Sequence, residues 1–547
     1  MVLLGTLVLA PVLLIFYQSF LDGAFFNETS RPSLDSFAYV LGDPAFYRAL
    51  KNTLLVALGM TAVAVPIGGA LAFLLTRSDL PCKPLLEILV LLPAFISSIV
   101  LAFGYVISMG PSGFVSLALR QWLGFVPWNL HSLTGIVIVA GISHVPYAYL
   151  YLASAMRQLP SDLEEAARVA GASVPRVLID VTLPMVLPAF VFATALIFLA
   201  GFGLFGVTLV LGDAQGIEVL MTYMHKLTII FGVPAYHLMA VVAALVMLMT
   251  GPIVLIQRRM VRNAERYAAI SGKAGQATPV ALGRVGRPLA LAAVLLWLAA
   301  AVLLPLAGIC LRAFVDAWGV GINPFEHLTL AHFNTLFEVP RLSRAIANTV
   351  VLATVGGLGA TFLYLLVGLA THRTRGAANA VLDALVLLPK ALPKLVLGLA
   401  FFWLFLFVPL LQPLRLTLIS IFVAYAVVGL SYGLRLIQRV LLQIRPELEE
   451  SARVCGATLL RTWWDVTIPL ARPGIVGAWA LIMLLFIRDY STGVYLVSSG
   501  TEVIGALLVS LQESGGLDII SALSMVSVLL TGMGIGLALR LGGRLNV

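Results

Sequence analysis

Long apolar stretches separated by short polar ones dominate this chain. Each stretch runs for about 20 residues or more, which is enough for an α-helix to cross a hydrocarbon core of roughly 30 Å. They do not show the ten-residue alternation that is typical of strands in an outer-membrane barrel. The pattern therefore predicts an all-α polytopic membrane protein with about 12 transmembrane helices. The apolar runs fall near residues 1–20, 50–76, 86–109, 133–156, 183–211, 235–257, 288–315, 345–371, 382–410, 415–436, 468–497 and 518–541.

The composition favours a membrane protein over a soluble globule. Of the 547 residues, 61% are hydrophobic and only 11% are charged, whereas an average soluble domain is roughly a quarter charged. Residues 1–20 are apolar from the start and lack a basic segment, so we interpret them as a first membrane helix rather than a signal peptide. We attribute the net charge of +9 to basic residues held at one membrane face, and we expect no nucleic-acid partner.

The two halves of the chain resemble each other. Asn52-Thr53-Leu54 matches Asn348-Thr349-Val350, and Leu91-Leu92-Pro93 matches Leu387-Leu388-Pro389, both with an offset of 296 (348 − 52). Six apolar runs per copy give both copies the same orientation, so the duplication is parallel rather than inverted. We therefore predict a first six-helix repeat over 1–257, a basic cytoplasmic linker over 258–287 and a second six-helix repeat over 288–547.

One polar word occurs twice, in segments that join apolar runs. Glu164-Glu165-Ala166-Ala167-Arg168-Val169-Ala170-Gly171 returns as Glu449-Glu450-Ser451-Ala452-Arg453-Val454-Cys455-Gly456, with an offset of 285 (449 − 164). If the linker is cytoplasmic, about 22 of the 34 lysine and arginine residues share its face. The positive-inside rule then places both words in the cytoplasm.

Each word is expected to form a short helix of about two turns. In the first copy Ser161 fits the N-cap position of a capping box, Glu164 and Arg168 have the spacing of an ion pair, and Gly171 can end the helix. The second copy begins at Pro446 and lacks the serine cap. Such a helix is too polar to enter lipid, so it is either a plain connector or, as the repetition favours, a docking helix for a cytoplasmic partner.

The word resembles a known family motif. Followed by Val181-Thr182-Leu183-Pro184 and by Val466-Thr467-Ile468-Pro469, the two copies resemble the EAA loop in permease subunits of binding-protein-dependent ABC importers. Two copies in one chain resemble the fused permeases, in which one polypeptide replaces a dimer. The coupling residues that this resemblance implies are Glu164, Glu165, Ala166, Arg168, Gly171, Glu449, Glu450, Arg453 and Gly456.

The resemblance also implies a fold, partners and a location. The fold would be that of a type I ABC importer permease in the bacterial inner membrane. Each EAA loop would form a coupling helix seated in a groove of one of two cytoplasmic ATP-binding subunits, which bind the ATP and Mg²⁺. A periplasmic or lipid-anchored solute-binding protein would deliver the cargo.

Two further stretches resemble the ferric-iron import subgroup of the family. They are 205–212 leading to 218–220, and 488–491 leading to 500–503. This likeness implies ferric iron as the cargo. Related fused permeases import 2-aminoethylphosphonate, thiamine or polyamines, and these alternatives stay open. A proton- or sodium-coupled secondary transporter is the alternative from a different class, since it too can be a parallel duplication.

The sequence lacks the motifs that are typical of an ATPase, a zinc protease or a metal-binding cysteine pair. It has no GxxxxGK[ST] phosphate loop, so we expect a permease without catalytic residues of its own, driven by a partner ATPase. Neither an HExxH motif nor a CxxC pair occurs, and the three cysteines are far apart, so we predict no metal site and no disulfide framework.

Four charged residues lie inside apolar runs, namely Lys390, Lys394, Arg488 and Asp489. A charge at the centre of a bilayer costs at least about 2.5–3.5 kcal/mol on insertion scales, so such residues usually face a cavity or a partner. We therefore predict that they line the translocation pathway, with the two lysines on one helix face at i and i+4. The alternatives are lysines that snorkel to the headgroups and a structural ion pair for Arg488 and Asp489. Three cations against one anion favour an anionic cargo, or iron accompanied by anions.

Overall fold

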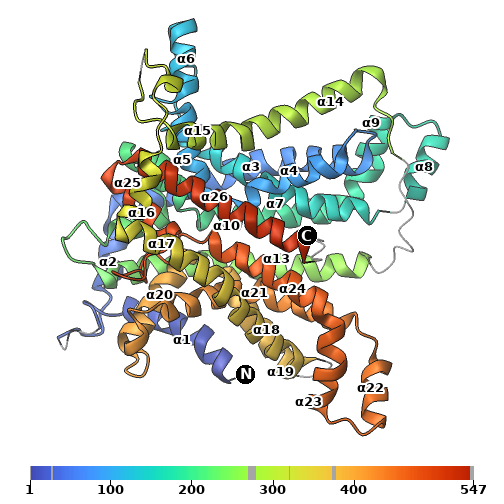
Figure 1. Ribbon diagram of the computed structural model, residues 1–547. Helices are drawn as coiled ribbons and strands as arrows, with labels where there is room; N and C mark the ends of the chain where they lie inside the picture. Colours follow the sequence, from blue (N-terminus) through green and yellow to red (C-terminus); the bar gives the residue numbers. More distant parts are fainter. Residues whose placement is uncertain are drawn as a thin grey trace. The chain divides into compact units, whose positions relative to one another are not determined.

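The protein is described from a computed structural model, which covers residues 2–541 apart from 26, 28, 160, 269–278, 320 and 373–376 (Figure 1). Over these residues the regular elements are helices, with only three isolated β-bridges, so the predicted all-α class is confirmed. The chain forms two compact units. The repeat-1 unit is Asp35–Leu328, and the repeat-2 unit combines Met1–Leu34 with Thr329–Val547.

The count of candidate spans is lower than the expected twelve. Within the described residues, ten helical segments are long and apolar enough to cross a membrane, or eleven if one bent pair counts as a single span. The predicted run at 1–20 gives an apolar helix, Leu4–Ser19, that is too short for this count. The run at 382–410 is the bent pair, with 109° between Val381–Lys390 and Lys394–Phe407.

The repeat-1 unit is built around the long helix α3. Its helices are α2 (Asp35–Gly42), α3 (Pro44–Arg77), α4 (Lys83–Phe95), α5 (Ser98–Met109), α6 (Phe114–Leu123), α7 (Leu133–Arg157), α8 (Ser161–Val169), α9 (Val174–Val177), η1 (Leu178–Thr182), α10 (Leu183–Phe202), α11 (Gly206–Gly212), η2 (Asp213–Gln215), α12 (Leu220–Lys226), α13 (Tyr236–Ala268), α14 (Gly283–Leu298), η3 (Ala299–Leu303), α15 (Leu304–Ala313) and η4 (Pro324–Glu326). Helix α3 packs against α7 and α10. A Cβ atom at Gly68 would lie 2.5 Å from the Cβ of Ala148, so only glycine allows α3 and α7 to approach this closely.

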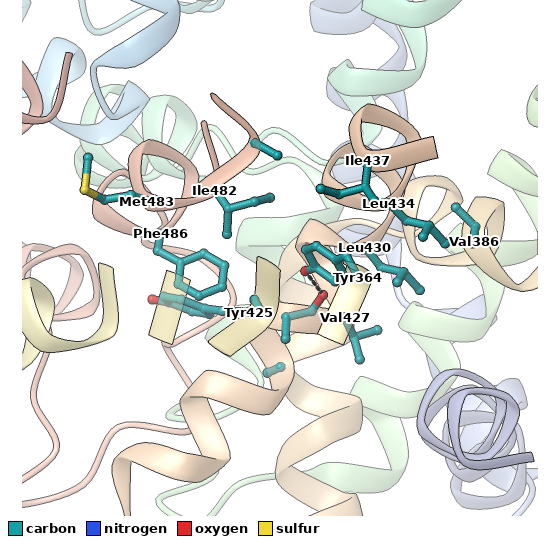
Figure 2. Close-up of a cluster of buried hydrophobic side chains, with 14 of the residues drawn as sticks. Tyr364, Val386, Tyr425, Val427, Leu430, Leu434, Ile437, Ile482, Met483 and Phe486 are labelled. Carbon is teal, nitrogen blue, oxygen red and sulfur yellow. Dashed lines mark hydrogen bonds between the residues drawn. The ribbon is translucent and has the colours of Figure 1, made fainter. Parts of the chain in front are cut away.

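The repeat-2 unit has the corresponding elements. They are α1 (Val2–Ser19), α16 (Ala331–Glu338), α17 (Pro340–Val351), η5 (Leu352–Gly356), α18 (Gly357–Thr371), α19 (Ala377–Ala391), α20 (Lys394–Phe407), η6 (Gln412–Leu414), α21 (Leu418–Leu442), α22 (Pro446–Val454), α23 (Leu459–Thr462), η7 (Trp463–Thr467), α24 (Ile468–Ile487), α25 (Ile504–Ser514) and α26 (Leu517–Arg540). Its core lies between α18, α21 and α24 (Figure 2). There the rings of Tyr425 and Phe486 meet edge to face at 5.3 Å, and the buried Tyr364 hydroxyl donates to the carbonyl of Ala426.

The first helix of each predicted repeat packs in the unit that holds the rest of the other repeat. Helix α1 contacts α19 and α20 in the repeat-2 unit. Helix α15 packs on α5 in the repeat-1 unit, where Ser108 Oγ donates to the carbonyl of Leu304 at 2.7 Å. The compact units therefore exchange their first helices relative to the sequence repeats.

The centre of the predicted linker, residues 269–278, lies outside the described residues. On either side of these residues, α13 continues to Ala268 and the chain from 279 to 328 belongs to the repeat-1 unit. The Val280 N–H donates to the carbonyl of Arg77 at 2.7 Å, and the Leu282 N–H donates to Asp79 Oδ1 at 3.1 Å.

Candidate coupling and translocation sites

The two polar words form two short helices of nine residues each, α8 and α22. Both helices end on a left-handed glycine, Gly171 with φ +88° and Gly456 with φ +89°. In each copy the glycine N–H bonds back three residues and the following alanine N–H bonds back five, to Ala167 and to Ala452, which is a Schellman ending. The same ending in both copies explains why each word closes on glycine.

The beginnings of the two helices differ. Pro160 and the side chain of Ser161 lie outside the described residues, so the predicted serine cap stays a prediction. In the second copy Arg445 occupies the N-cap position without a side-chain cap hydrogen bond, and Pro446 opens the helix. Proline suits this place because its missing N–H is one that the first turn leaves unpaired.

The first glutamate of the first word points into the protein. Glu164 is 6% exposed, and its Oε1 accepts a hydrogen bond of 2.8 Å from Thr182 at the end of η1. Its Oε2 lies 3.4 Å from Nη1 of Arg77, the last residue of α3. Arg77 also donates to the carbonyls of Met156 and Leu159 at the end of α7. Through Thr182 and Arg77, one carboxylate thus joins α8 to the ends of three spans.

The second word repeats this junction with one change. Glu449 is 9% exposed, and its Oε1 accepts a hydrogen bond of 2.9 Å from Thr467 at the end of η7. The ring nitrogen Nε2 of His372, just after α18, lies 3.3 Å from the same oxygen. A histidine therefore contacts the second carboxylate where an arginine contacts the first.

The predicted coupling residues fall into two groups. Glu164 and Glu449 are buried, whereas Glu165, Ala166, Glu450 and Arg453 are exposed. The ion pair described for Glu164 is with Arg77 rather than with the expected Arg168, whose Nε and Nη2 atoms are buried without a hydrogen-bond partner.

An apolar feature of the same surface was missed by the sequence reasoning. Val169 and Val454, at the same position in both copies, are 89% and 87% exposed. The sequence contained a sign of this feature, because each copy keeps a valine at this place in a word that is otherwise polar or small.

In Figure 1, α22 lies beside α23 at one end of α24, and α8 in its own unit contacts α9 and η1.

The four intramembrane charges are divided between two places in the repeat-2 unit. Lys390 is in α19 and Lys394 begins α20, on opposite sides of the 109° bend at Pro393, so the expectation that they share one helix face is wrong. Lys394 Nζ lies 2.8 Å from Oδ2 of Asp489, which is only 4% exposed. Proline at the bend ends the helix ladder and separates the two lysines.

Asp489 is held by more than the lysine. Its Oδ1 accepts the backbone N–H of Thr492 at 3.0 Å, and its Oδ2 accepts the Thr492 hydroxyl at 3.2 Å. Lys394, Arg488 and Asp489 line a cavity of about 40 Å³ together with Tyr425 and Tyr432. The described partner of Asp489 is therefore Lys394, on a helix distant in sequence, rather than the neighbouring Arg488.

A known protein family matches most of this chain. The family described as "Binding-protein-dependent transport system inner membrane component" matches residues 64–262 and 364–541, which is more than half of the chain. The chain belongs to this family of permeases. It is thus the permease component of a binding-protein-dependent ABC importer, a multi-pass inner-membrane protein, and not the ATPase.

Individual relatives are distant. The ferric transport system permease protein FbpB of Actinobacillus pleuropneumoniae is 23% identical over 509 residues, covering 92% of this chain and 72% of that protein. The probable ABC transporter permease protein y4fN of Sinorhizobium fredii is 26% identical, covering 96% of this chain and 93% of that one. The molybdenum transport system permease protein ModB of Escherichia coli is 31% identical over 31% of this chain and 73% of its own length.

Among solved structures, a bacterial alginate ABC transporter in complex with a pentasaccharide-bound periplasmic protein matches 42% of this chain and 83% of its own. The identity is 22% and the TM-score is 0.35. Each of the two ranges that the family matches includes one of the short polar helices, α8 in 64–262 and α22 in 364–541. The permease therefore carries two family domains, each with its own EAA word.

Proposed function

We propose that this permease is the complete membrane pathway of an importer that moves ferric iron from a periplasmic binding protein into the cytoplasm by alternating access. Two identical ATP-binding subunits would seat α8 and α22 and bind the ATP and Mg²⁺. The observation that carries the proposal is the pair of coupling helices in one chain, each with an exposed face and a buried glutamate. A chain that offers two such helices needs no second permease subunit.

Ferric iron as cargo has more limited support. Two relatives that extend over at least 90% of this chain are described as a ferric transport permease and a putative one, at 23% and 22% identity. The stretches that resemble the iron subgroup, 205–212 with 218–220 and 488–491 with 500–503, contain Glu218, Asp489 and Glu502. Selection of the cargo is assigned to the binding protein, and the permease would provide a passage without a tight site.

The test is uptake into cells that produce the permease with its ATPase and binding protein. We expect ATP-dependent accumulation of radiolabelled ferric citrate that stops when either partner is omitted. If iron is not taken up but radiolabelled 2-aminoethylphosphonate, thiamine or spermidine is, in an ATP-dependent manner, that solute would replace iron as the cargo. Uptake that survives ATP depletion and collapses with an uncoupler would instead identify a secondary transporter and overturn the proposal.

A further inference from the structure

The contact between a coupling-helix glutamate and a threonine occurs twice, at equivalent places. Glu164 accepts from Thr182 at 2.8 Å and Glu449 accepts from Thr467 at 2.9 Å, and donor and acceptor are 18 positions apart in both copies. The four residues are buried, each with 9% or less of its surface exposed. Outside a few repeated motifs the two halves have diverged in sequence, so the same contact in both points to a shared task.

Each threonine is the last residue of a π-helical turn. In η1 the N–H of Leu183 bonds to the carbonyl of Leu178, and in η7 the N–H of Ile468 bonds to that of Trp463, which are five-residue steps. Such turns are rare and are places where a helix changes register or direction more easily than in a regular ladder. Each π turn leads directly into a span, η1 into α10 and η7 into α24.

Burial makes this contact resistant to sliding. A hydrogen bond to an ionised carboxylate is stronger than one between neutral groups, and the low dielectric of a buried site strengthens it further. If α8 moved without the start of α10, a buried carboxylate would lose a donor that water does not replace. The contact therefore favours movement of the helix and the π turn together.

We propose that Thr182 and Thr467 are positioning residues that pass the displacement of the coupling helices into spans α10 and α24 through their bonds to Glu164 and Glu449. This inference rests on the proposed function, because it requires an ATPase that moves α8 and α22. It separates two roles within the EAA word. The exposed Glu165 and Glu450 belong to the docking face, and the buried Glu164 and Glu449 belong to the transmission inside the permease.

The experiment removes the hydroxyl and keeps the volume. Thr182→Val and Thr467→Val are made in the full permease, purified with its ATPase and placed in nanodiscs. Hydrogen exchange of 161–169 and of 178–190, and of their second-half equivalents, is followed with and without ATP plus vanadate. Both segments should respond in the unaltered complex. In Thr182→Val the response of 161–169 should remain, while that of 178–190 should fall about fivefold or more, the size of a modest allosteric coupling.

Matched variants distinguish transmission from loss of structure. Thr182→Ser keeps the donor and should restore the response. Thr250→Val and Thr361→Val serve as controls, because each removes a buried hydroxyl whose described bonds stay within its own helix. Thr250 donates to the carbonyls of Val246 and Met247, and Thr361 donates to that of Gly357. Both variants should leave the response of 178–190 unchanged. Because the contact exists twice, Thr467→Val tests it independently if Thr182→Val does not assemble.

The possible outcomes distinguish a failure of this inference from a failure of the proposed function. Equal responses of 178–190 in Thr182→Val and in the unaltered protein, with the same result at Thr467, would overturn this inference and leave the importer intact. An unaltered complex whose coupling helices show no response to ATP would contradict the proposed function, and this inference with it.

Discussion

Lys394 and Asp489 form an ion pair that joins the start of α20 to the end of α24, 95 residues apart in the chain. The aspartate side chain is 3% exposed and the lysine side chain 37%. An anion this deeply buried is stable only with its partners in place, because leaving it unpaired costs its desolvation.

The pair predicts an asymmetric mutational result. Lys394→Met should destabilise the permease by about 1–3 kcal/mol, since it leaves a buried carboxylate without its cation. The double variant Lys394→Met with Asp489→Asn should recover most of this loss, because a neutral amide can still accept the Thr492 N–H. Thermal unfolding in detergent measures both. Equal stability of the single and double variants would show that the pair is not coupled.

The exposed valines predict a docking contact. Val169→Asp and Val454→Asp should each weaken co-purification with the ATPase about tenfold or more, because burial of a valine side chain contributes roughly 1.5–3 kcal/mol. Both side chains are almost fully exposed, so unfolding of the free permease should not change. Val285→Asp is a matched control at 72% exposure outside the words. Unimpaired assembly of both variants would exclude these valines from the interface.

The threonine of the repeated Asn-Thr pair fixes the start of a distant helix in each half, α12 in the first and α25 in the second. Thr53 Oγ1 accepts the N–H of Leu220 at 2.8 Å, and Thr349 Oγ1 accepts the N–H of Ile504 at 2.9 Å. Thr53→Val should cost about 1–3 kcal/mol, because it leaves a buried N–H unpaired. Hydrogen exchange at 219–224 should speed up, while Thr53→Ser should stay close to the unaltered protein. If hydrogen exchange at 219–224 does not change in Thr53→Val, the Thr53 side chain does not stabilise the start of α12.

Glu502 predicts a dependence on pH. Burial raises the pKa of this carboxyl, but bonds from backbone N–H groups and the guanidinium of Arg344 outweigh it and hold the pKa below its usual value. Arg344 lies 3.4 Å from Oε1 and the Gly500 N–H donates to Oε2 at 3.0 Å. A lowered folded pKa gives stability that is present above the usual glutamate pKa and is lost as pH falls through the folded value.

The measurement compares unfolding from neutral pH down to acid conditions. Glu502→Gln should be less stable than the unaltered protein at neutral pH and should lose less stability on acidification, because it no longer titrates. Glu513→Gln, at an exposed position of α25, serves as the control. If Glu502→Gln and the unaltered protein fall in parallel with pH, the carboxylate at 502 does not contribute.

Part of the fold and of the site could be read from local sequence. A bilayer requires apolar segments of a certain length, so ten of the twelve expected spans could be read from hydropathy. The expected cytoplasmic face follows from the flanking charges through the positive-inside rule. The EAA word is likewise local, since a helix of two turns and its glycine ending are encoded in about ten residues. The threonine 18 residues after each inner glutamate was also visible as a repeated spacing.

Other features needed the tertiary structure. Hydropathy could not tell which glutamate of each word faces inward, because Glu164 and Glu165 are equally polar and only packing against Arg77 and Thr182 distinguishes them. It could not show that Lys390 and Lys394 are separated by a bend, or that Asp489 is paired with Lys394. The exchange of α1 and α15 between the compact units was equally hidden.

The sequence by itself determined that this chain spans the membrane and that one polar word occurs twice in it, and it predicts a parallel duplication. These properties depend on transfer energies and helix signals that act within short windows. Only the tertiary structure decided which side chains of the words are exposed and which are buried and bond inward. That choice depends on partners 18 and 87 residues away, such as Thr182 and Arg77 for Glu164, and such partners meet only when the spans pack.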